Sequence, residues 1–320
     1  MRALEAPNLA DIEAARGRLR GVALRTPLVR LPPGLTDGEV YLKLENLQPI
    51  GSFKLRGAYN AVGLAGRERV AAGVYTASAG NIAQGVAWAA RQMGVPATAV
   101  VPDHAPETKL AAIERLGGRV VRVPFDRWWQ VILEHEYPDL DGLFIHPVSD
   151  RGVMAGNGTI GLEILEDLPD VDTVLVPYGG GGLSCGIAAA LRAKRPAARV
   201  VACEVETASP FTASLAAGAP ELVDYQPSFV DGIGGKSVLE EMWPLASRLL
   251  AGSTVVPLAA VAAAIRLLAE RCRIVAEGAG ATALAAALAG AGAGGKVVCV
   301  VSGGNIDTAK LVAILDGRVP

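Results

Sequence analysis

Lys54 lies between an aromatic residue and the expected start of a helix, in the stretch "GSFKLRGA" at residues 51–58. A lysine amine can act as a nucleophile or a base when its surroundings keep it unprotonated. A surface lysine that caps a turn leaves the same local pattern. The choice between covalent chemistry and a solvent-exposed cap therefore depends on which other groups the fold brings near Lys54.

Three glycine-rich loops follow apolar stretches of the chain. Their sequences are "SAGNIAQG" at 78–85, "GGGG" at 179–182 and "SGGN" at 302–305. Four consecutive glycines leave backbone N–H groups unshielded by side chains, and a helix that begins behind them adds its N-terminal dipole. This arrangement favours a phosphate-binding loop at 179–182 over a flexible linker.

Other cofactor motifs do not fit the chain. The Gly-x-Gly-x-x-Gly pattern of dinucleotide folds matches no register of residues 179–186, and the stretch "DGIGGKS" has Val230 where a P-loop needs glycine. The three histidines, His104, His135 and His146, show no metal-ligand spacing, and no Cys-x-x-Cys occurs. We therefore expect no catalytic metal.

Short apolar runs alternate with helical stretches from about residue 40 to the end. Runs at 40–45, 73–78, 97–102, 118–124 and 142–147 form one series of expected strands, and runs at 173–178, 199–206 and 296–302 form another. Helical periodicity covers 82–93, 107–116 and 159–168. This alternation predicts an α/β fold with two open, mostly parallel twisted sheets covered by helices. We expect a large cofactor-binding domain (1–70 and 148–320) and a small substrate-loop domain (71–147).

Composition excludes several classes of protein. The 320 residues carry a formal charge of −2, so neither a nucleic-acid surface nor an acidic tail is indicated. No apolar run is long enough to span a membrane, and the N-terminal stretch is typical of an amphipathic helix rather than a signal peptide. Four dispersed cysteines in apolar runs indicate buried free thiols in a reducing compartment. A cytoplasmic protein is expected.

Seven short motifs occur along the chain in this order: "GSFKLRGA", "TASAGNIAQGVA", "AGNGTIGLEIL", "PYGGGGL", "VDGI", "EGAGA" and "SGGN". Together they resemble the threonine/serine dehydratase and serine racemase family, within the fold-type-II (tryptophan synthase beta-like) pyridoxal phosphate enzymes. The resemblance runs from about Thr26 to Asn305. It implies pyridoxal 5′-phosphate as the cofactor and an amino acid as the substrate.

The resemblance also implies a role for each matching residue. Lys54 would form the Schiff base and act as the catalytic base, Phe53 would pack against the cofactor ring, Asn81 would bind O3′, and Ser302 would meet the ring nitrogen. The phosphate would be held by Gly179, Gly180, Gly181, Gly182 and Leu183, and the substrate carboxylate by Ser78, Ala79, Gly80, Asn81 and Ile82. A hydroxyl at Ser302 cannot keep the ring nitrogen protonated as a carboxylate can, which suits loss of a β-hydroxyl better than transamination.

The implied activity is that of an ammonia-lyase (a carbon–nitrogen lyase) that converts L-threonine, L-serine or a related 3-hydroxy amino acid to a 2-oxo acid and ammonia. A dehydratase of a bulkier substrate such as phenylserine, and an amino-acid racemase on the same fold, stay as alternatives. A non-catalytic binding protein is disfavoured because Lys54 and Ser302 are both present. The family implies a homodimer or higher homo-oligomer with a catabolic role. The chain ends soon after residue 305, so we expect no appended regulatory domain.

Two departures from the family pattern bear on the substrate. Ile82 stands where the family usually has histidine, and Ala79 stands where its racemases carry serine, which disfavours racemisation. Trp128 and Trp129 occupy positions where smaller or charged residues are commoner. They either pack a helix or shape a roomier apolar pocket.

A third departure concerns a divalent cation. The family's cation site, where present, uses a glutamate, a backbone carbonyl and a later acidic residue. Glu204 and Ala208 match the first two positions, but Pro210 stands at the third. We therefore expect no metal at this position.

Overall fold

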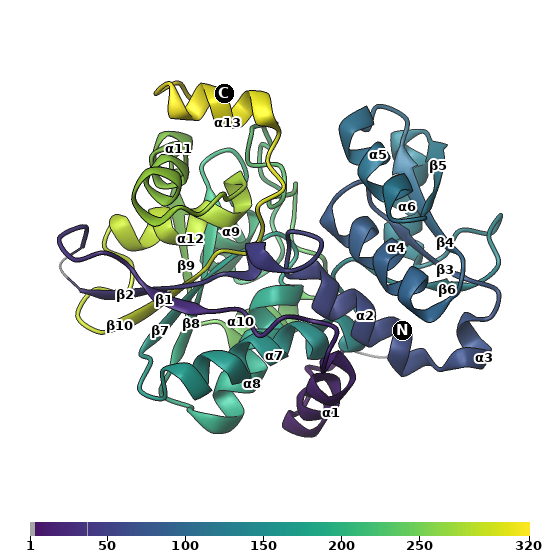
Figure 1. Ribbon diagram of the computed structural model, residues 1–320, viewed down its shortest axis with the longest axis horizontal. Coiled ribbons are helices and arrows are strands. Elements are labelled where there is room, and N and C mark those ends of the chain that lie inside the picture. The colour runs from purple at the N-terminus through teal and green to yellow at the C-terminus, as the bar shows by residue number, and fades with distance from the viewer. Residues whose placement is uncertain (1–3, 37) are drawn as a thin grey trace.

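The computed structural model describes residues 4–36 and 38–320, which form two sheets flanked by helices (Figure 1). The larger sheet has the order β1-β2-β10-β7-β8-β9 and the smaller sheet the order β5-β4-β3-β6. Every neighbouring pair is parallel except β1 with β2. The predicted α/β class with two mostly parallel sheets is confirmed.

The strands of the larger sheet are β1 (Leu28–Arg30), β2 (Glu39–Lys43), β7 (Thr173–Pro177), β8 (Arg199–Val205), β9 (Ser253–Val256) and β10 (Lys296–Val300), and those of the smaller sheet are β3 (Val74–Ala77), β4 (Ala97–Pro102), β5 (Arg119–Val123) and β6 (Leu143–Phe144). The sequence missed β1 and β9. Both are short edge strands with partly exposed residues, so neither forms a continuous apolar run.

The helices are α1 (Leu9–Leu19), α2 (Lys54–Ala65), α3 (Arg67–Val70), α4 (Asn81–Met93), α5 (Glu107–Arg115), α6 (Phe125–Glu134), α7 (Arg151–Asp167), α8 (Gly182–Lys194), α9 (Pro210–Ala217), α10 (Trp243–Leu249), α11 (Leu258–Leu267), α12 (Gly278–Leu288) and α13 (Thr308–Leu315), with a 3₁₀ turn η1 (Glu45–Leu47) and a π turn η2 (Leu268–Cys272). None of the helices in the described part of the chain combines the length and the apolar character needed to cross a bilayer.

Parallel strands at the centre of the larger sheet are buried on both faces, as their unbroken apolar sequences predict. All five residues of β7 are buried, and buried clusters cover the sheet on its two sides. The smaller sheet has its own core, formed with α4 and α5 on one side and α6 on the other. Three of the predicted buried thiols are buried, but Cys272 is partly exposed because it lies in the π turn η2.

Helix α7 begins eight residues before the predicted start at residue 159. Asp150 caps it by accepting a hydrogen bond from the backbone N–H of Val153 at 2.9 Å. The glycines in "RGVMAGNG" interrupt the apolar periodicity of a helix in the sequence. In the structure they let α7 pack closely against neighbouring backbone. A Cβ atom on Gly156 would lie 2.3 Å from the carbonyl oxygen of Arg56 in α2. Helix α2 lies between the small domain and α7 (Figure 1), so this close approach fixes the element that carries Lys54.

Candidate active site

Lys54 is the first residue of α2, and the end of β10 lies beside it. The backbone N–H of Phe53 donates to the carbonyl oxygen of Ser302 at 3.0 Å. The Lys54 amine donates to the carbonyl oxygen of Pro147 at 3.1 Å and lies 5.2 Å from the centroid of the Phe53 ring. Burial lowers the pKa of Lys54 to about 8, although the charge of Glu277 opposes the shift. The amine is therefore far more available as a nucleophile or base near neutral pH than an ordinary lysine.

The glycine loop 179–182 joins β7 to α8, as predicted. Gly181 caps α8 with φ +95°, a backbone conformation that strongly favours glycine, and no side chain caps this helix end. Among the described residues, none accepts a hydrogen bond from the backbone N–H groups of residues 179–183. These donors, together with the positive end of α8, can bind a phosphate group.

The glycine loop lies against Val148 in the segment that leads into α7. A Cβ atom at Gly180 would lie 2.6 Å from Val148 Cγ2, and one at Gly182 would lie 2.9 Å from the Val148 carbonyl oxygen. Larger residues would therefore displace the loop from its neighbour. Packing therefore favours glycine at these positions, and glycine also leaves the backbone N–H groups accessible to an anion.

Asn81 begins α4 and faces the larger domain. Its side-chain amide donates to Glu277 Oε1 at 2.9 Å, and its carbonyl oxygen accepts from Asn305 at 2.8 Å. Asn305 also donates to the carbonyl oxygen of Ile50 at 2.9 Å. The predicted substrate loop and the "SGGN" loop therefore meet at one place, between the two sheets.

The other predicted substrate-loop residues lie at the end of β3 and the start of α4. The hydroxyl oxygen of Ser78 accepts from the backbone N–H of Gly80 at 3.1 Å, which shapes the loop. Ala79 is partly buried, and Ile82 is only 3 % exposed within the apolar core of the small domain. Ser302 is buried at the end of β10, and among the described residues no group hydrogen-bonds its hydroxyl.

Glu277 was not assigned a role from the sequence, although its motif "EGAGA" was noticed. Burial raises the pKa of its carboxyl group to about 7, while the hydrogen bond from Asn81 acts in the opposite direction. A cleft of about 630 Å³ opens beside it, lined also by Lys109, Asp231 and Lys310. The one sequence signal was an acidic residue at the start of an otherwise apolar glycine–alanine helix. Glu277 thus places a titratable group between the substrate loop and Lys54.

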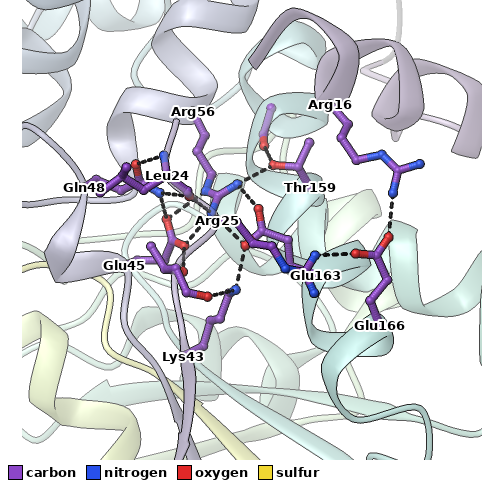
Figure 2. A network of polar contacts seen from close by, with 12 residues as sticks. Arg16, Leu24, Arg25, Lys43, Glu45, Gln48, Arg56, Thr159, Glu163 and Glu166 are labelled. Carbon is purple, nitrogen blue, oxygen red and sulfur yellow. Dashed lines mark hydrogen bonds and ion pairs between the residues drawn. The ribbon is translucent and has the colours of Figure 1, made fainter. Parts of the chain in front are cut away.

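A buried ionic network holds the first turn of α2 in place (Figure 2). The guanidinium of Arg56 donates to both carboxylate oxygens of Glu45 at 2.8 Å and to Glu163 Oε1 at 2.6 Å. Lys43 donates to Glu163 Oε2 at 2.6 Å. These four residues connect β2, η1, α2 and α7. Because Arg56 is two residues after Lys54, the network fixes the backbone from which the reactive amine extends.

Glu204, the position considered for a cation, is engaged by protein groups. Its Oε1 accepts from the backbone N–H of Phe211 at 2.8 Å, and its Oε2 accepts from the backbone N–H and hydroxyl of Thr212 at 2.8 and 2.6 Å. Burial raises the pKa of this carboxyl, although these hydrogen bonds oppose the shift. Glu204 thus caps the start of α9, and Pro210 opens that helix in place of an acidic ligand.

Trp128 and Trp129 lie on α6, with ring centroids 6.1 Å apart. Trp128 packs on the core of the small domain beneath α6, whereas Trp129 is 40 % exposed. Neither residue lines the cleft beside Glu277. These contacts favour the packing interpretation over a role in shaping the pocket.

The lowered pKa of Lys54 predicts its labelling by a small amine-reactive reagent. Labelling of the cofactor-free protein should reach half its maximal rate near pH 8, because only the unprotonated amine reacts. A peptide of sequence 51–58 is the control, and its lysine should titrate near the ordinary value of about 10.4. Peptide mass spectrometry after brief exposure across a pH series measures both. A folded-state midpoint near that of the peptide would contradict the desolvation of Lys54.

Comparison with known proteins places this chain in a family. The family model described as pyridoxal-phosphate dependent enzyme matches residues 19–303. An L-threonine ammonia-lyase of Thermotoga maritima is 42 % identical over 313 residues, covering 96 % of this chain and 78 % of the relative. The chain belongs to the pyridoxal-phosphate-dependent enzymes, and pyridoxal phosphate is its cofactor.

Solved structures agree with this assignment. The structure of maize serine racemase superimposes on this chain with a TM-score of 0.88 and 31 % sequence identity, and the aligned region covers 98 % of each chain. The processed form of threonine deaminase isoform 2 from Solanum lycopersicum has a TM-score of 0.85 at 33 % identity and covers 99 % of this chain and 91 % of that one. The predicted fold type and cofactor are thus confirmed.

The geometry of this chain fits the cofactor. A glycine loop with unused N–H donors suits its phosphate, a desolvated amine at Lys54 suits its aldehyde, and a buried hydroxyl at Ser302 suits a neutral ring nitrogen. All three lie at the carboxyl ends of parallel strands or directly beside them, where ligands of open α/β sheets bind.

Proposed function

We propose that this protein is a pyridoxal-phosphate-dependent ammonia-lyase that converts L-threonine, L-serine or a related 3-hydroxy amino acid to a 2-oxo acid and ammonia. The observation that carries the proposal is the Lys54 amine, which is buried, has a lowered pKa and donates to the carbonyl oxygen of Pro147, the residue before the one that packs on the glycine loop. Relatives named L-threonine ammonia-lyase and threonine deaminase support the reaction class.

Three parts of the chain have defined tasks at the cofactor in this proposal. Lys54 holds the cofactor through its aldehyde and, once released by the substrate amine, takes the Cα proton. The backbone N–H groups of residues 179–183, from Gly179 to Leu183, bind the phosphate. When bound, pyridoxal phosphate supplies the electron sink for loss of the β-hydroxyl. The Ser302 hydroxyl donates to the unprotonated ring nitrogen, so it fixes no positive charge there.

The substrate is oriented from the small domain. Backbone donors of the loop 78–82 receive its carboxylate, and Asn81 stays close to the cofactor ring through its bond to Glu277. Substrate binding at this loop ties the small domain to the larger one. Water is thereby excluded from the reacting atoms when the two domains meet around the ligand.

Racemisation is the second candidate, because maize serine racemase has a similar structure. Ala79 lacks a hydroxyl that could donate a proton to the face of Cα opposite Lys54. Chiral analysis of residual substrate, performed beside an assay for 2-oxo acid, distinguishes the two activities. Accumulation of the D-amino acid faster than the 2-oxo acid would reverse the assignment.

We expect threonine to be preferred over serine. A pocket that favours one extra methyl group distinguishes two substrates by about 10–200-fold in kcat/KM, so a preference of at least about tenfold is predicted. Ile82 stands in place of the expected histidine, and its buried apolar side chain puts no polar ring beside the loop proposed to bind substrate. The measurement is kcat/KM for serine, threonine and threo-phenylserine, with phenylserine expected to rank second.

Two variants test whether Ile82 contributes to that preference. Ile82→His should lower the threonine-to-serine ratio, whereas Ile82→Leu, which keeps an apolar side chain of similar size, should preserve it. Serine as the best substrate of the unmodified protein, or equal ratios in both variants, would exclude Ile82 as a determinant of specificity.

We also propose that the protein is a cytoplasmic homodimer with a catabolic role and that serine is a further substrate. The family resemblance and the prevalence of twofold-symmetric oligomers support the assembly. The dispersed free cysteines support a reducing compartment.

A further inference from the structure

The segment that joins β6 to α7 contains a turn built around a histidine side chain. His146 is 3 % exposed, and its Nδ1 accepts hydrogen bonds from the backbone N–H groups of Val148 at 3.0 Å and Ser149 at 2.7 Å. A ring nitrogen that accepts two N–H groups carries no proton, so the neutral ring has its proton on Nε2. The side chain thus replaces backbone acceptors in a tight turn, as asparagine and aspartate do elsewhere.

This turn touches both halves of the proposed cofactor site. The carbonyl oxygen of Pro147 accepts the hydrogen bond from the Lys54 amine at 3.1 Å. The next residue, Val148, is the one against which Gly180 and Gly182 are packed. A change in the turn would therefore move the acceptor of the catalytic amine and the support of the phosphate loop together.

We propose that His146 is a positioning residue: by holding the turn 146–149 through its Nδ1, it sets the place of the Lys54 amine and of the glycine loop. The inference rests on the proposed roles of Lys54 and of residues 179–183. His146 itself touches neither the substrate nor the cofactor in this assignment. It acts through the backbone of Pro147 and Val148.

Neighbouring residues hold the His146 ring in a neutral form. The ring of His135 lies over it with centroids 4.4 Å apart, and His135 Nε2 lies 3.1 Å from Glu241 Oε1 of the larger domain. Burial, with the nearby His135, lowers the pKa of His146 to about 3. The ring therefore keeps its acceptor nitrogen across the physiological pH range.

The same three residues could be considered a metal site, because their ligand atoms lie within 4.8 Å of one another. The tautomer argues against it. Nδ1 of His146 is committed to two backbone N–H groups, and Nε2 carries the proton, so the ring has no free lone pair for a cation. The arrangement instead shields the turn and connects it to the segment before α10.

Substitutions of His146 test whether the turn needs a hydrogen-bond acceptor at the position of Nδ1 or only a side chain that fills the space of the ring. In His146→Asn the side-chain oxygen takes the place of Nδ1 and can accept both N–H groups, whereas His146→Leu offers no acceptor. His146→Gln carries its amide at the position of Nε2 and also leaves the turn unsupported. His104→Asn, on an exposed histidine of the small domain, is the control.

Two measurements are needed besides turnover: the dissociation constant of pyridoxal phosphate for the cofactor-free protein, and the pH midpoint of Lys54 labelling. Loss of two buried hydrogen bonds should weaken cofactor binding by about tenfold or more in His146→Leu and His146→Gln. The labelling midpoint should also move away from 8 in both. His146→Asn and His104→Asn should stay within about threefold of the unmodified protein, a smaller change than the loss of one typical buried hydrogen bond would cause.

Cofactor binding unchanged in His146→Leu, or equally weakened in His146→Asn and His146→Leu, would overturn the positioning role. If the leucine variant does not fold, the comparison of His146→Asn with His146→Gln decides in the same way. Borohydride reduction of the unmodified holoenzyme provides the separate check. If reduction does not attach pyridoxal phosphate to Lys54, the proposed function is contradicted, whatever the variants at residue 146 show.

Discussion

Replacing Lys54 with alanine is expected to lower kcat by at least about 10²–10⁴-fold, the range attributed to one positioned acid–base group. The variant loses the amine that attaches the cofactor as well as the base that takes the Cα proton. Borohydride should then fix no pyridoxal phosphate on the chain, although the glycine loop can still bind the phosphate. The measurements are 2-oxo acid release and the mass of the reduced, denatured protein.

Two further variants separate amine chemistry from charge and folding. Lys54→Arg keeps a positive charge but supplies no neutral amine, so it should be as inactive as Lys54→Ala. Lys194→Ala, on the exposed surface of α8, should keep full activity and normal reduction. Covalent attachment of the cofactor to Lys54→Ala after reduction would show that another amine is the attachment site.

The sequence predicted those parts of the site that arise from neighbouring residues. Glycine runs after apolar strands identified the loops at 179–182 and 302–305, and the carboxyl ends of parallel strands meet at one edge of a sheet. The position of Lys54 directly before a helix drew attention to it, but its predicted role came from the resemblance of seven ordered motifs to a known family. Periodicity and turn chemistry act over a few residues, so a single sequence is enough to reveal them.

Long-range pairings were not predictable in the same way. Asn81 bonds to Glu277 across 196 residues, and Arg56 bonds to Glu163 across 107. No spacing rule connects such partners; only the folded packing of the two domains does. The turn at His146 was missed for a related reason, since a histidine that accepts backbone N–H groups resembles any other buried histidine in the sequence.

The same limit explains the misplaced start of α7. Glycine is unfavourable inside a helix, and the predicted helix began only after "AGNG", at residue 159. In the structure the cost is offset by close contact, with Gly156 against the backbone of Arg56. A local propensity is outweighed here by tertiary packing that a single sequence does not reveal.

Replacing Arg56 with methionine is expected to lower the free energy of unfolding by about 3–5 kcal/mol, the usual cost of removing one partner from a buried ion pair. Arg56 is 1 % exposed, and with Lys43 it balances the charges of Glu45 and Glu163. Without the guanidinium, two carboxylates share one buried cation. Urea unfolding of the cofactor-free protein, followed by circular dichroism, measures the loss.

The pH dependence of this loss tests its electrostatic origin. Burial opposes ionisation of Glu45, but Arg56 outweighs it and holds the pKa of Glu45 below its ordinary value. A carboxyl with a lowered folded-state pKa contributes stability above its unfolded pKa, and that contribution disappears as the pH falls. The difference between the unmodified protein and Arg56→Met should therefore shrink as the pH is lowered from 7 through the ordinary glutamate value of 4.5.

A surface pair in the same region provides the matched control. Arg16 is exposed and donates to Glu166 at 2.6 Å (Figure 2). Arg16→Met should cost less than about 1 kcal/mol, because exposed ion pairs are solvated and screened. Glu163→Gln added to Arg56→Met should restore part of the lost stability by removing the unpaired charge. Equal losses in Arg16→Met and Arg56→Met would mean that the buried network does not hold α2, and Lys54 with it, in place.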